Sequence, residues 1–336
     1  MEQDMTTRLD TRRNFLRASA ALSLAAAGLD SRAQTLPATI RILVGFAAGG
    51  ATDNVIRTLA GEMSAALDGR PVIVDNKPGA NQIPAIQALR AAPPDGGTLF
   101  LGTGSSLAQN PGVQKGLPYS PEADFTPIAI IGTSPGAFMV RTSLPVKSLR
   151  ELIDYARKNP GKLNYGSAGV GSANQLSMEA FLLATDTKMV HVPLKADSAV
   201  MLEMQAERID VSISTMQVVQ AALPTGKVRM LALTSVEPLP FAPGVPTLKE
   251  ANVPGLEGLD PFTFYGLVGP KGMPPEIVRT LNRAVNQALA KQENRQRLQD
   301  QLRVDPVSGT TEQFQVYLKK ELHKWSELGK RIKLDN

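Results

Sequence analysis

Short apolar runs alternate along the chain with stretches in which apolar residues recur at helical spacing. The first run, residues 40–46, carries a single charge, which is typical of a strand buried on both faces of a parallel sheet. Behind it the helical spacing is set by Val55, Ile56, Leu59, Met63 and Leu67. The same patterns predict further strands at 72–75, 98–102, 128–131, 137–141, 163–165, 189–192, 211–214, 228–234 and 262–268, and helices at 83–91, 149–158, 174–184, 198–207, 216–223, 275–291 and 311–330. This alternation predicts an α/β fold.

A glycine-rich turn joins the first strand to the first helix. Residues 47–51 are all small, so the backbone there can turn sharply and approach a bound molecule. We expect Thr52 and Asp53 to cap the helix with their side-chain oxygens. The free N–H groups at such a helix start form a seat for an anion. The turn has neither the lysine of a Walker loop nor the glycine order of a dinucleotide loop. Taken alone, a turn of this kind more often binds nothing.

A second segment repeats this outline. Residues 166–172 are small, carry hydroxyl groups and separate a strand from the helix that starts near Asn174. Two such turns on two α/β domains can face each other across a cleft, and a ligand held between two helix N-termini explains both. Ser105 lies in another hydroxyl-rich turn at the carboxyl end of a strand, where open α/β sheets bind ligands. Lys195 is ambiguous: such a lysine is usually only solvated, yet its loop is expected to open toward the cleft.

Two stretches rich in proline or glycine divide the chain. Residues 132–136 predict a hinge because a new series of elements begins after them, and residues 238–261 predict the return crossing. The strand at 262–268 is then expected to rejoin the first domain. We therefore predict a discontinuous first domain at 34–134 plus 260–336, a second domain at 137–255, and hinge crossings near 132–136 and 238–261.

The N-terminus has the pattern of an export signal. Residues 11–17 contain twin arginines, residues 18–29 are weakly hydrophobic, and Ser31 and Ala33 are small residues at the positions that a signal peptidase reads. The apolar run is too short for a membrane span, which needs about 20 residues. We predict a twin-arginine (Tat) signal peptide over residues 1–33, with a Sec signal as the alternative. Either route takes the mature chain out of the cytoplasm.

Charge and cysteine content narrow the partners. The full chain has 36 basic and 31 acidic residues, and removal of residues 1–33 takes away five arginines and four acids, which leaves 31 against 27, or +4. This mild excess, without a run of basic residues, argues against binding to nucleic acid. The chain has no cysteine, so a lipoprotein anchor, disulfide bonds and thiol catalysis are all excluded.

Enzyme signatures are missing from the sequence. There are two histidines, no cluster with zinc spacing and no G-x-S-x-G elbow, which Gly166–Gly169 misses by one position. We expect His191, within an apolar strand, to be a hydrogen-bonded core residue rather than a base. The sequence therefore predicts a protein that is not an enzyme and that uses no cofactor and no metal.

A set of short motifs in fixed order identifies a family. They are the first strand and turn, D-N-K-P-G-A at 75–80, P-D-G at 94–96, L-P-Y at 117–119, the turn at 166–172, H-V-P at 191–193, L-A-L-T at 231–234 and V-P-T at 245–247. Together they resemble the extracytoplasmic solute-binding proteins of tripartite tricarboxylate transporters, the Bug family of Gram-negative bacteria. The resemblance covers essentially all of residues 38–330.

The resemblance implies a two-domain periplasmic binding protein of type II, a Venus flytrap in which each domain is a mixed, mostly parallel sheet flanked by helices. In that family a ligand carboxylate meets backbone N–H groups, hydroxyls and ordered waters from two facing loops. With the residues considered above, the candidate ligand-binding set is Phe46, Ala47, Gly50, Ala51, Thr52, Asp53, Ser105, Ser167, Ala168, Gly169, Gly171, Ser172 and Lys195. The chain departs from the family pattern at several positions, among them Gly45, Asn81, Gln82 and Gln175.

The resemblance also implies a function. We expect a monomer that captures a small organic acid, which is a mono-, di- or tricarboxylate, and delivers it to the membrane subunits of a tripartite transporter. Two other classes stay open. One is a liganded sensor that docks on a membrane kinase, and the other is an extracytoplasmic enzyme of a kind that the motifs do not reveal.

Overall fold

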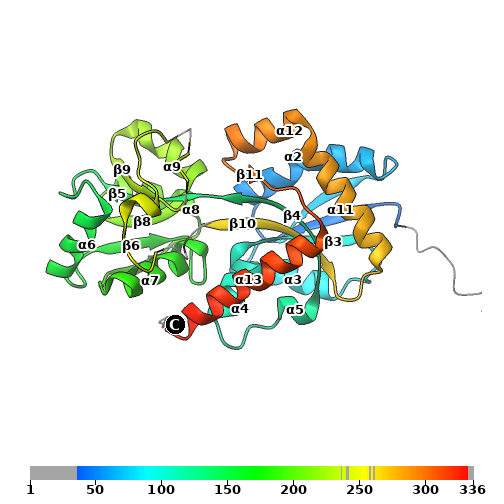
Figure 1. Ribbon diagram of the computed structural model, residues 1–336, viewed down its shortest axis with the longest axis horizontal. Coiled ribbons are helices and arrows are strands. Elements are labelled where there is room, and N and C mark those ends of the chain that lie inside the picture. The colour runs from blue at the N-terminus through cyan, green and yellow to red at the C-terminus, as the bar shows by residue number, and fades with distance from the viewer. Residues whose placement is uncertain (1–35, 236, 240–241, 257–258, 260–261, 332–336) are drawn as a thin grey trace, which may run out of the picture. The chain divides into compact units, whose positions relative to one another are not determined.

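The computed structural model describes residues 36–235, 237–239, 242–256, 259 and 262–331, and Leu36 begins its main compact unit. The predicted signal peptide lies outside the described residues. No helix in the described ranges is both long enough and apolar enough to span a bilayer. The strands of these residues form two mixed sheets with helices packed on them, so the predicted α/β class is confirmed (Figure 1).

The first sheet has the strand order β11-β4-β10-β3-β1-β2. Its strands are β1 (Ile40–Val44), β2 (Val72–Asn76), β3 (Thr98–Thr103), β4 (Phe125–Ser134), β10 (Thr263–Pro270) and β11 (Asp305–Pro306). The strand β1 pairs in parallel with β2 and β3, whereas β10 runs antiparallel to β3 and β4. The predicted strand near 262–268 therefore does rejoin the sheet that begins at β1.

The second sheet has the order β7-β6-β8-β5-β9. Its strands are β5 (Gly136–Arg141), β6 (Asn164–Ser167), β7 (Val190–Pro193), β8 (Val211–Thr215) and β9 (Val228–Leu233). The strand β6 pairs in parallel with β7 and β8, and β5 is antiparallel to β8 and β9. The register of β6 and β7 places Tyr165 opposite His191, which matters for the site described below.

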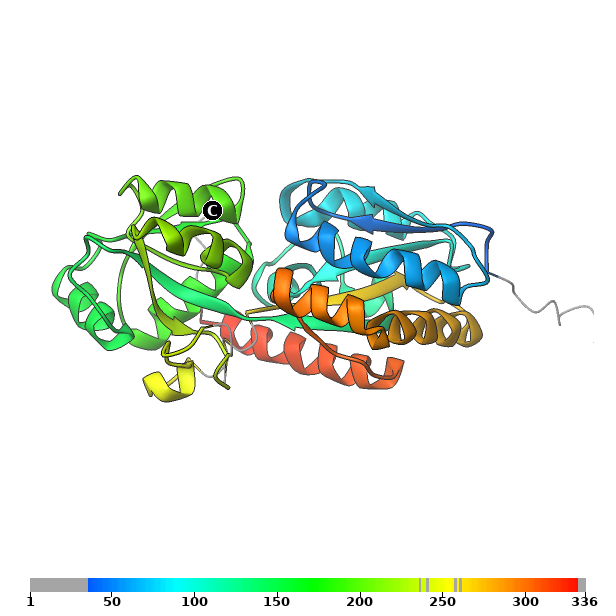
Figure 2. The same cartoon turned by 90° about the horizontal axis from the view of Figure 1, so that it is seen from above.

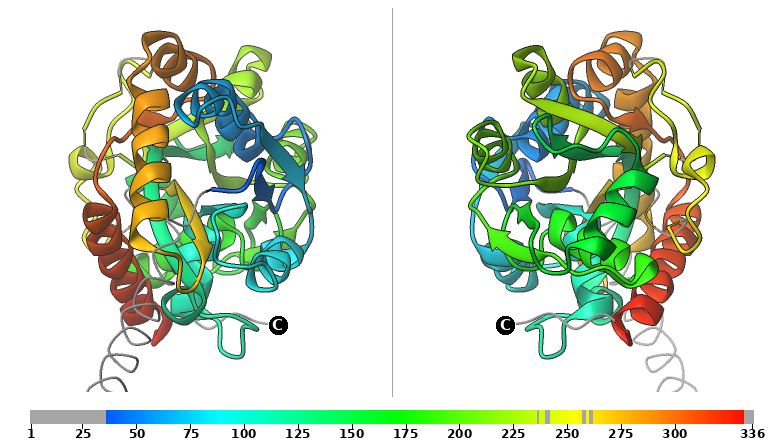
Figure 3. Two further views of the ribbon diagram at one scale, coloured as in Figure 1. Left: turned by 90° about the vertical axis from the view of Figure 1, so that its right-hand side faces the viewer. Right: turned by 90° about the vertical axis from the view of Figure 1, so that its left-hand side faces the viewer.

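The longer helices follow the predicted apolar spacing, whereas the helices of four or five residues were not predicted. They are α2 (Ala51–Ala66), α3 (Ile83–Arg90), α4 (Asn110–Val113), α5 (Pro121–Asp124), α6 (Leu149–Lys158), α7 (Ala173–Thr185), α8 (Asp197–Gln205), α9 (Met216–Ala222), α10 (Leu248–Ala251), α11 (Pro275–Ala290), α12 (Gln292–Gln296) and α13 (Thr311–Gly329). Shorter helical turns are η1 (Ala80–Gln82), η2 (Ser105–Gln109), η3 (Leu223–Thr225) and η5 (Arg297–Gln301). Figure 2 shows α11 beside α2, and Figure 3 shows α13 packed along β4 and α4.

The passage from the first sheet to the second is short. The strand β4 ends at Ser134 and β5 begins at Gly136, so Pro135 alone separates them. Most of the predicted hinge segment is thus strand, because Gly132 pairs with both β10 and β11. Without an N–H of its own, proline is a natural place for the ladder to break. The domain boundaries themselves stay a prediction.

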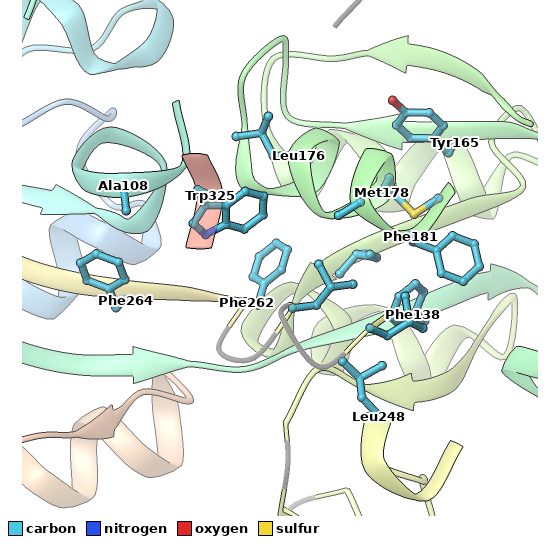
Figure 4. Close-up of a cluster of buried hydrophobic side chains, with 14 of the residues drawn as sticks. Ala108, Phe138, Tyr165, Leu176, Met178, Phe181, Leu248, Phe262, Phe264 and Trp325 are labelled. Carbon is cyan, nitrogen blue, oxygen red and sulfur yellow. The ribbon is translucent and has the colours of Figure 1, made fainter. Parts of the chain in front are cut away.

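Buried apolar side chains connect the two sheets. One cluster contains Phe100 and Phe314 from the first sheet's side together with Phe138 and Phe181 from the second. Figure 4 shows part of this apolar cluster, where Leu176 of α7 lies near Trp325 of α13 and Phe262. Full burial of a large apolar side chain contributes about 1.5–3 kcal/mol. The apolar stripe of α13 is part of this core: Phe314, Leu318 and Trp325 are buried, and Tyr317, Leu322 and Leu328 pack against the cluster.

Candidate functional site

The first loop, Gly45–Gly50, connects β1 to α2. The prediction that Thr52 and Asp53 cap this helix is wrong, because Gly50 is the N-cap and both residues lie inside the first turn. Gly49, at φ +79°, lets the chain turn before the helix begins. Asp53 is therefore placed to reach back, and its carboxylate accepts a 2.8 Å hydrogen bond from the Gly49 N–H. The carboxylate holds the loop instead of starting the helix.

Asp53 is also tied to two side chains. Its carboxylate accepts hydrogen bonds from Arg57 Nε at 2.8 Å and from Asn76 Nδ2 at 2.9 Å, and Asn76 Nδ2 donates as well to the carbonyl of Phe46 at 3.0 Å. Burial alone raises the pKa of Asp53, but the hydrogen bonds from Arg57, Gly49 and Asn76 outweigh it and keep the pKa below its usual value. The charged form of Asp53 thus orders the first loop.

The other predicted binding residues in the first loop and in the first turn of α2 differ in their solvent exposure. Phe46 and Ala47 are exposed, Gly50 and Ala51 are partly exposed, and Thr52 is buried. The first N–H groups of α2 have no partner within a helix of this geometry. The backbone at the start of α2, rather than the Asp53 carboxylate, is the part of this loop suited to an anion.

The second loop, Ala168–Gly171, lies between Ser167 at the end of β6 and Ser172, the N-cap of α7. Ser172 Oγ accepts a 3.4 Å hydrogen bond from the Gln175 N–H, a weak form of an N-cap bond. Gly169 and Gly171 have φ of +114° and +75°, conformations that favour glycine. Like the first loop, it ends at the N-terminus of a helix that follows a parallel strand.

A directed chain of hydrogen bonds fixes the second loop. The Gly171 N–H donates to Gln175 Oε1 at 2.7 Å, so the Gln175 amide nitrogen is turned to His191 Nδ1, 3.2 Å away. The Nδ1 atom must accept, which leaves the ring proton on Nε2, 2.6 Å from Ser167 Oγ. The Ser167 hydroxyl then donates to the Gly169 carbonyl at 3.1 Å. We call this series of bonds the His191 relay.

The direction of the His191 relay decides what Ser167 can do chemically. Because His191 Nε2 carries its proton toward Ser167, the imidazole cannot take the hydroxyl proton as a base does in a serine nucleophile pair. Burial also lowers the pKa of His191, which favours the neutral ring. Ser167 is fully buried, and its hydroxyl accepts a 3.1 Å hydrogen bond from the Gly169 N–H, so it helps to order the loop. Its contact with a ligand stays a prediction.

His191 itself departs from its expected role in one respect. It is hydrogen-bonded as predicted, but it lies half-buried on the edge strand β7 rather than in the core, with its ring stacked on Tyr165 at 4.8 Å between centroids. The link to Ser167 depends on which residues of β6 and β7 lie side by side. No local sequence pattern gives that register.

Replacement of His191 by phenylalanine keeps the ring on Tyr165 and removes both ring nitrogens. We expect the free energy of unfolding to fall by about 2–3 kcal/mol at pH 7, because Ser167 and Gln175 lose buried partners. The same change at the exposed His323 of α13 should stay within about 0.5 kcal/mol. Urea unfolding of both variants measures the difference, and equal losses would contradict the role of the His191 relay.

The pH dependence of this loss has a definite sign. The pKa of His191 is lowered in the folded protein, so the unfolded chain binds more protons and the neutral ring stabilises the fold above the ordinary pKa of about 6.5. This contribution is lost as the pH falls from about 6.5 through the folded pKa. The difference in the free energy of unfolding between the wild type and His191→Phe should therefore narrow on acidification.

Two consecutive residues bring the two loops together. Asn81 and Gln82, in the turn η1 after β2, lie between them. A β-carbon at Gly45 of the first loop would lie 2.6 Å from Gln82 Cγ, and one at Gly171 of the second loop would lie 2.7 Å from Asn81 Oδ1. Gly171 also faces Asn110, whose Oδ1 is 2.6 Å from the same position, and Gln114. Both loops thus meet at one polar junction.

Ser105 and Lys195 complete the predicted set. Ser105 opens the helical turn η2 rather than a loop, and its buried hydroxyl lies 2.8 Å from Thr103 Oγ1 and 3.2 Å from Gln82 Nε2, beside the junction. Lys195 is exposed, in a loop that touches the second loop because the Leu194 N–H donates to the Ser167 carbonyl at 2.9 Å. Ser105 is therefore part of the junction, and Lys195 lies at its rim.

Sequence reasoning missed the carboxylate of Asp197. It accepts hydrogen bonds from Asn174 Nδ2 at 2.9 Å, Thr215 N at 3.0 Å and Thr215 Oγ1 at 2.9 Å, which ties the starts of α7 and α8 to the end of β8. Burial raises the pKa of Asp197, although the hydrogen bonds from these donors act in the opposite direction. The charge of Asp197 adds to burial in raising the pKa of Tyr265 on β10. The position of Asp197 at the start of a predicted helix is a signal that the sequence does contain. Its hydrogen-bond partners could not be predicted, because they lie far from it in the sequence.

One surface hollow lies away from both loops. This hollow, of about 420 Å³, is lined by Arg90, Asp124 and Lys271 among others, none of which belongs to either loop, and Arg90 is paired with Asp124 at 3.0 Å. No group of three or more histidine and acidic side chains in the described ranges could hold a metal ion.

The sequence matches a known family. The sequence model of the tripartite tricarboxylate transporter family receptor matches residues 55–334. The chain belongs to this receptor family. A UPF0065 protein of Bordetella pertussis is 33% identical over 276 residues, which are 82% of this chain and 84% of that protein. Protein BugT of the same species is 29% identical over 307 residues, 90% of this chain and 93% of its own. The resemblance to Bug proteins is confirmed.

Solved structures with a similar fold include the periplasmic binding protein BugD. Rpa4515 of R. palustris, solved with adipate, superimposes with a TM-score of 0.77 at 30% identity, over 87% of this chain and 96% of that one. MatC of Rhodopseudomonas palustris, solved with bound malate, gives a TM-score of 0.77 at 29% identity, over 87% and 98% of the two chains. Both of these similar proteins were solved with a small carboxylate.

Proposed function

We propose that this receptor captures a small organic carboxylate between the first and second loops and delivers it to the membrane subunits of a tripartite transporter. The observation that carries the proposal is the junction at Asn81 and Gln82, which lies against Gly45 of the loop before α2 and Gly171 of the loop before α7. A helix N-terminus offers N–H groups and the positive end of a dipole to an anion. The adipate and malate found in similar receptors support a carboxylate as the ligand class.

The loops can hold a carboxylate without a cationic side chain. Neither residues 45–53 nor residues 166–172 include a lysine or arginine. Hydrogen bonds to a charged group contribute roughly 1.5–3 kcal/mol each. Four or five of them reach about 8 kcal/mol, which corresponds to a micromolar dissociation constant. The donors that we assign are backbone N–H groups at the starts of α2 and α7, with the hydroxyls of Thr52 and Ser172.

Delivery requires the site to open. We infer that the parts carrying the two sheets move about the crossing at Pro135 and the return segment before β10, and close on the ligand. The polar contacts at Gly171 suit such a motion, because amide groups exposed on opening can bond to water. Similar receptors are periplasmic proteins, and we propose the same location here, reached by the twin-arginine signal at residues 1–33 and with the receptor acting as a monomer.

Calorimetry against mono-, di- and tricarboxylates, with the matching carboxamides, tests this proposal. We expect micromolar binding of at least one acid and no binding of its amide. Ala168→Asp should abolish binding, since it places a like charge in the second loop. Its control is Ala65→Asp on an exposed position of α2, about 20 Å along the helix from its N-terminus, which should bind as the wild type does. Wild-type affinity in Ala168→Asp would place the anion elsewhere.

A further inference from the structure

Asn81 and Gln82 have an unusual backbone conformation. Their φ angles are +53° and +62°, in the left-handed region that residues other than glycine rarely adopt. Two such residues in succession persist only where their surroundings hold them, and strain of this kind collects at ligand sites. The contacts of the Gln82 side chain show what holds this conformation.

Packing and hydrogen bonds fix the position of the Gln82 side chain. Its stem packs on Gly45, where a β-carbon would lie 2.6 Å from Gln82 Cγ and closer still to its Cβ, so glycine at 45 and glutamine at 82 fit as a pair. The amide nitrogen lies 2.8 Å from Thr103 Oγ1 and 3.2 Å from Ser105 Oγ. The side chain is 2% exposed, and its Oε1 has no hydrogen-bond partner among the described residues.

The neighbouring turn adds more buried amide oxygens. Gln109 donates its amide nitrogen to the Phe262 carbonyl at 3.2 Å, which fixes the orientation of its amide, and within the described part of the chain its Oε1 has no partner. Asn110, fully buried beside Gly171, has no partner there for either amide atom. Buried polar atoms without partners are rare and costly in folded proteins. Three amide oxygens and one amide nitrogen therefore await partners, so this group of side chains is rich in acceptors.

We propose that Gln82, with Asn110, forms a second subsite that accepts hydrogen bonds from an O–H or N–H group on the ligand. This inference rests on the proposed function, in which the carboxylate end of the ligand lies at the two helix N-termini. A second carboxylate offers only acceptors, so it cannot satisfy the amide oxygens, whereas a hydroxyl, carboxamide or ammonium group can. The substrate class is then a carboxylate whose far end carries a hydrogen-bond donor.

The test is a ligand series that differs only at the far end. Butyrate, succinate, 4-hydroxybutyrate, 4-aminobutyrate and succinamate, with their five- and six-carbon homologues, are titrated by calorimetry. At the chain length that binds best, we expect a donor-ended acid to bind at least tenfold more tightly than the acid ending in methyl or carboxylate, because a polar site rejects groups that leave it unpaired.

Gln82→Gly isolates the side chain. Glycine relieves the left-handed strain, so the variant should be no less stable than the wild type in urea. Its preference for donor-ended over methyl-ended acids should fall below threefold, whatever its absolute affinity. Asn252→Gly, at an exposed residue with φ +48° after α10, relieves the same strain elsewhere and should leave the preference unchanged.

The outcomes separate the two proposals. A wild type that prefers dicarboxylates, or a preference that survives in Gln82→Gly, overturns the donor subsite and leaves carboxylate capture standing. Failure of every acid to bind overturns carboxylate capture and the subsite with it.

Discussion

Replacement of Gly171 by valine is expected to weaken ligand binding at least a hundredfold in a chain that still folds. A side chain at this position would collide with the amides of Asn81, Asn110 and Gln114, at 2.6–2.7 Å for the two asparagines and closer for Gln114. These amides belong to the side of the first sheet, whereas Gly171 belongs to the second, so the collision pushes the two loops apart. A misplacement of about 1 Å in such a site is enough for a loss of this order.

The control for this variant is Gly226→Val. Gly226 also has a positive φ, +68°, but a β-carbon there meets nothing within 4 Å. Both valines bear the backbone cost of roughly 1–2 kcal/mol for a left-handed residue. Only the variant at 171 should lose affinity in calorimetry with an acid that the wild type binds. Similar affinity in the two variants would show that the contact at Gly171 is not needed for binding.

Asp53→Asn should lower the free energy of unfolding by about 2–3 kcal/mol at pH 7. The change removes the charge that accepts hydrogen bonds from Gly49, Arg57 and Asn76, and hydrogen bonds to a charged group are worth roughly 1.5–3 kcal/mol. Asp68→Asn is the matched control. The Asp68 side chain is 90% exposed and pairs with Arg70 at 2.9 Å, so its loss should cost less than about 1 kcal/mol.

The effect of Asp53 depends on pH with a predictable sign. The pKa of Asp53 is lowered in the folded protein, so its stabilisation is present above the unfolded pKa of about 4 and is lost as the pH falls through the folded value. The difference between the wild type and Asp53→Asn, measured by urea unfolding, should shrink below about pH 4. A difference that stays constant down to pH 2 would rule out the charge as the source.

Local patterns in the sequence predict the elements of this fold well. The helix α2 follows from the spacing of Val55, Ile56, Leu59 and Met63, all of which are buried, because one apolar stripe must face the sheet. The return of β10 to the first sheet also follows, since it is an apolar run after a segment rich in proline and glycine. The apolar pattern does not fix the residue at which α2 begins. That residue decides whether the Asp53 side chain caps the helix or accepts a hydrogen bond from Gly49.

Contacts between residues far apart in sequence are the other limit. His191 orders Ser167 only because β7 lies beside β6 in one register, and Gln82 reaches Gly45 only through the turn after β2. In the sequence, the departures from the family pattern at Gly45, Gln82 and Gln175 show no relation to one another or to other residues. The structure shows that Gly45 and Gln82 fit each other and that Gln175 is a member of the His191 relay.

A crystal structure of the mature chain with a bound acid, chosen by calorimetry, tests directly whether a carboxylate lies between the first and second loops. We expect carboxylate oxygens within about 3 Å of backbone N–H groups from both residues 46–53 and residues 167–173. A carboxylate bound instead by cationic side chains, or located in the hollow lined by Arg90 and Lys271, would contradict it.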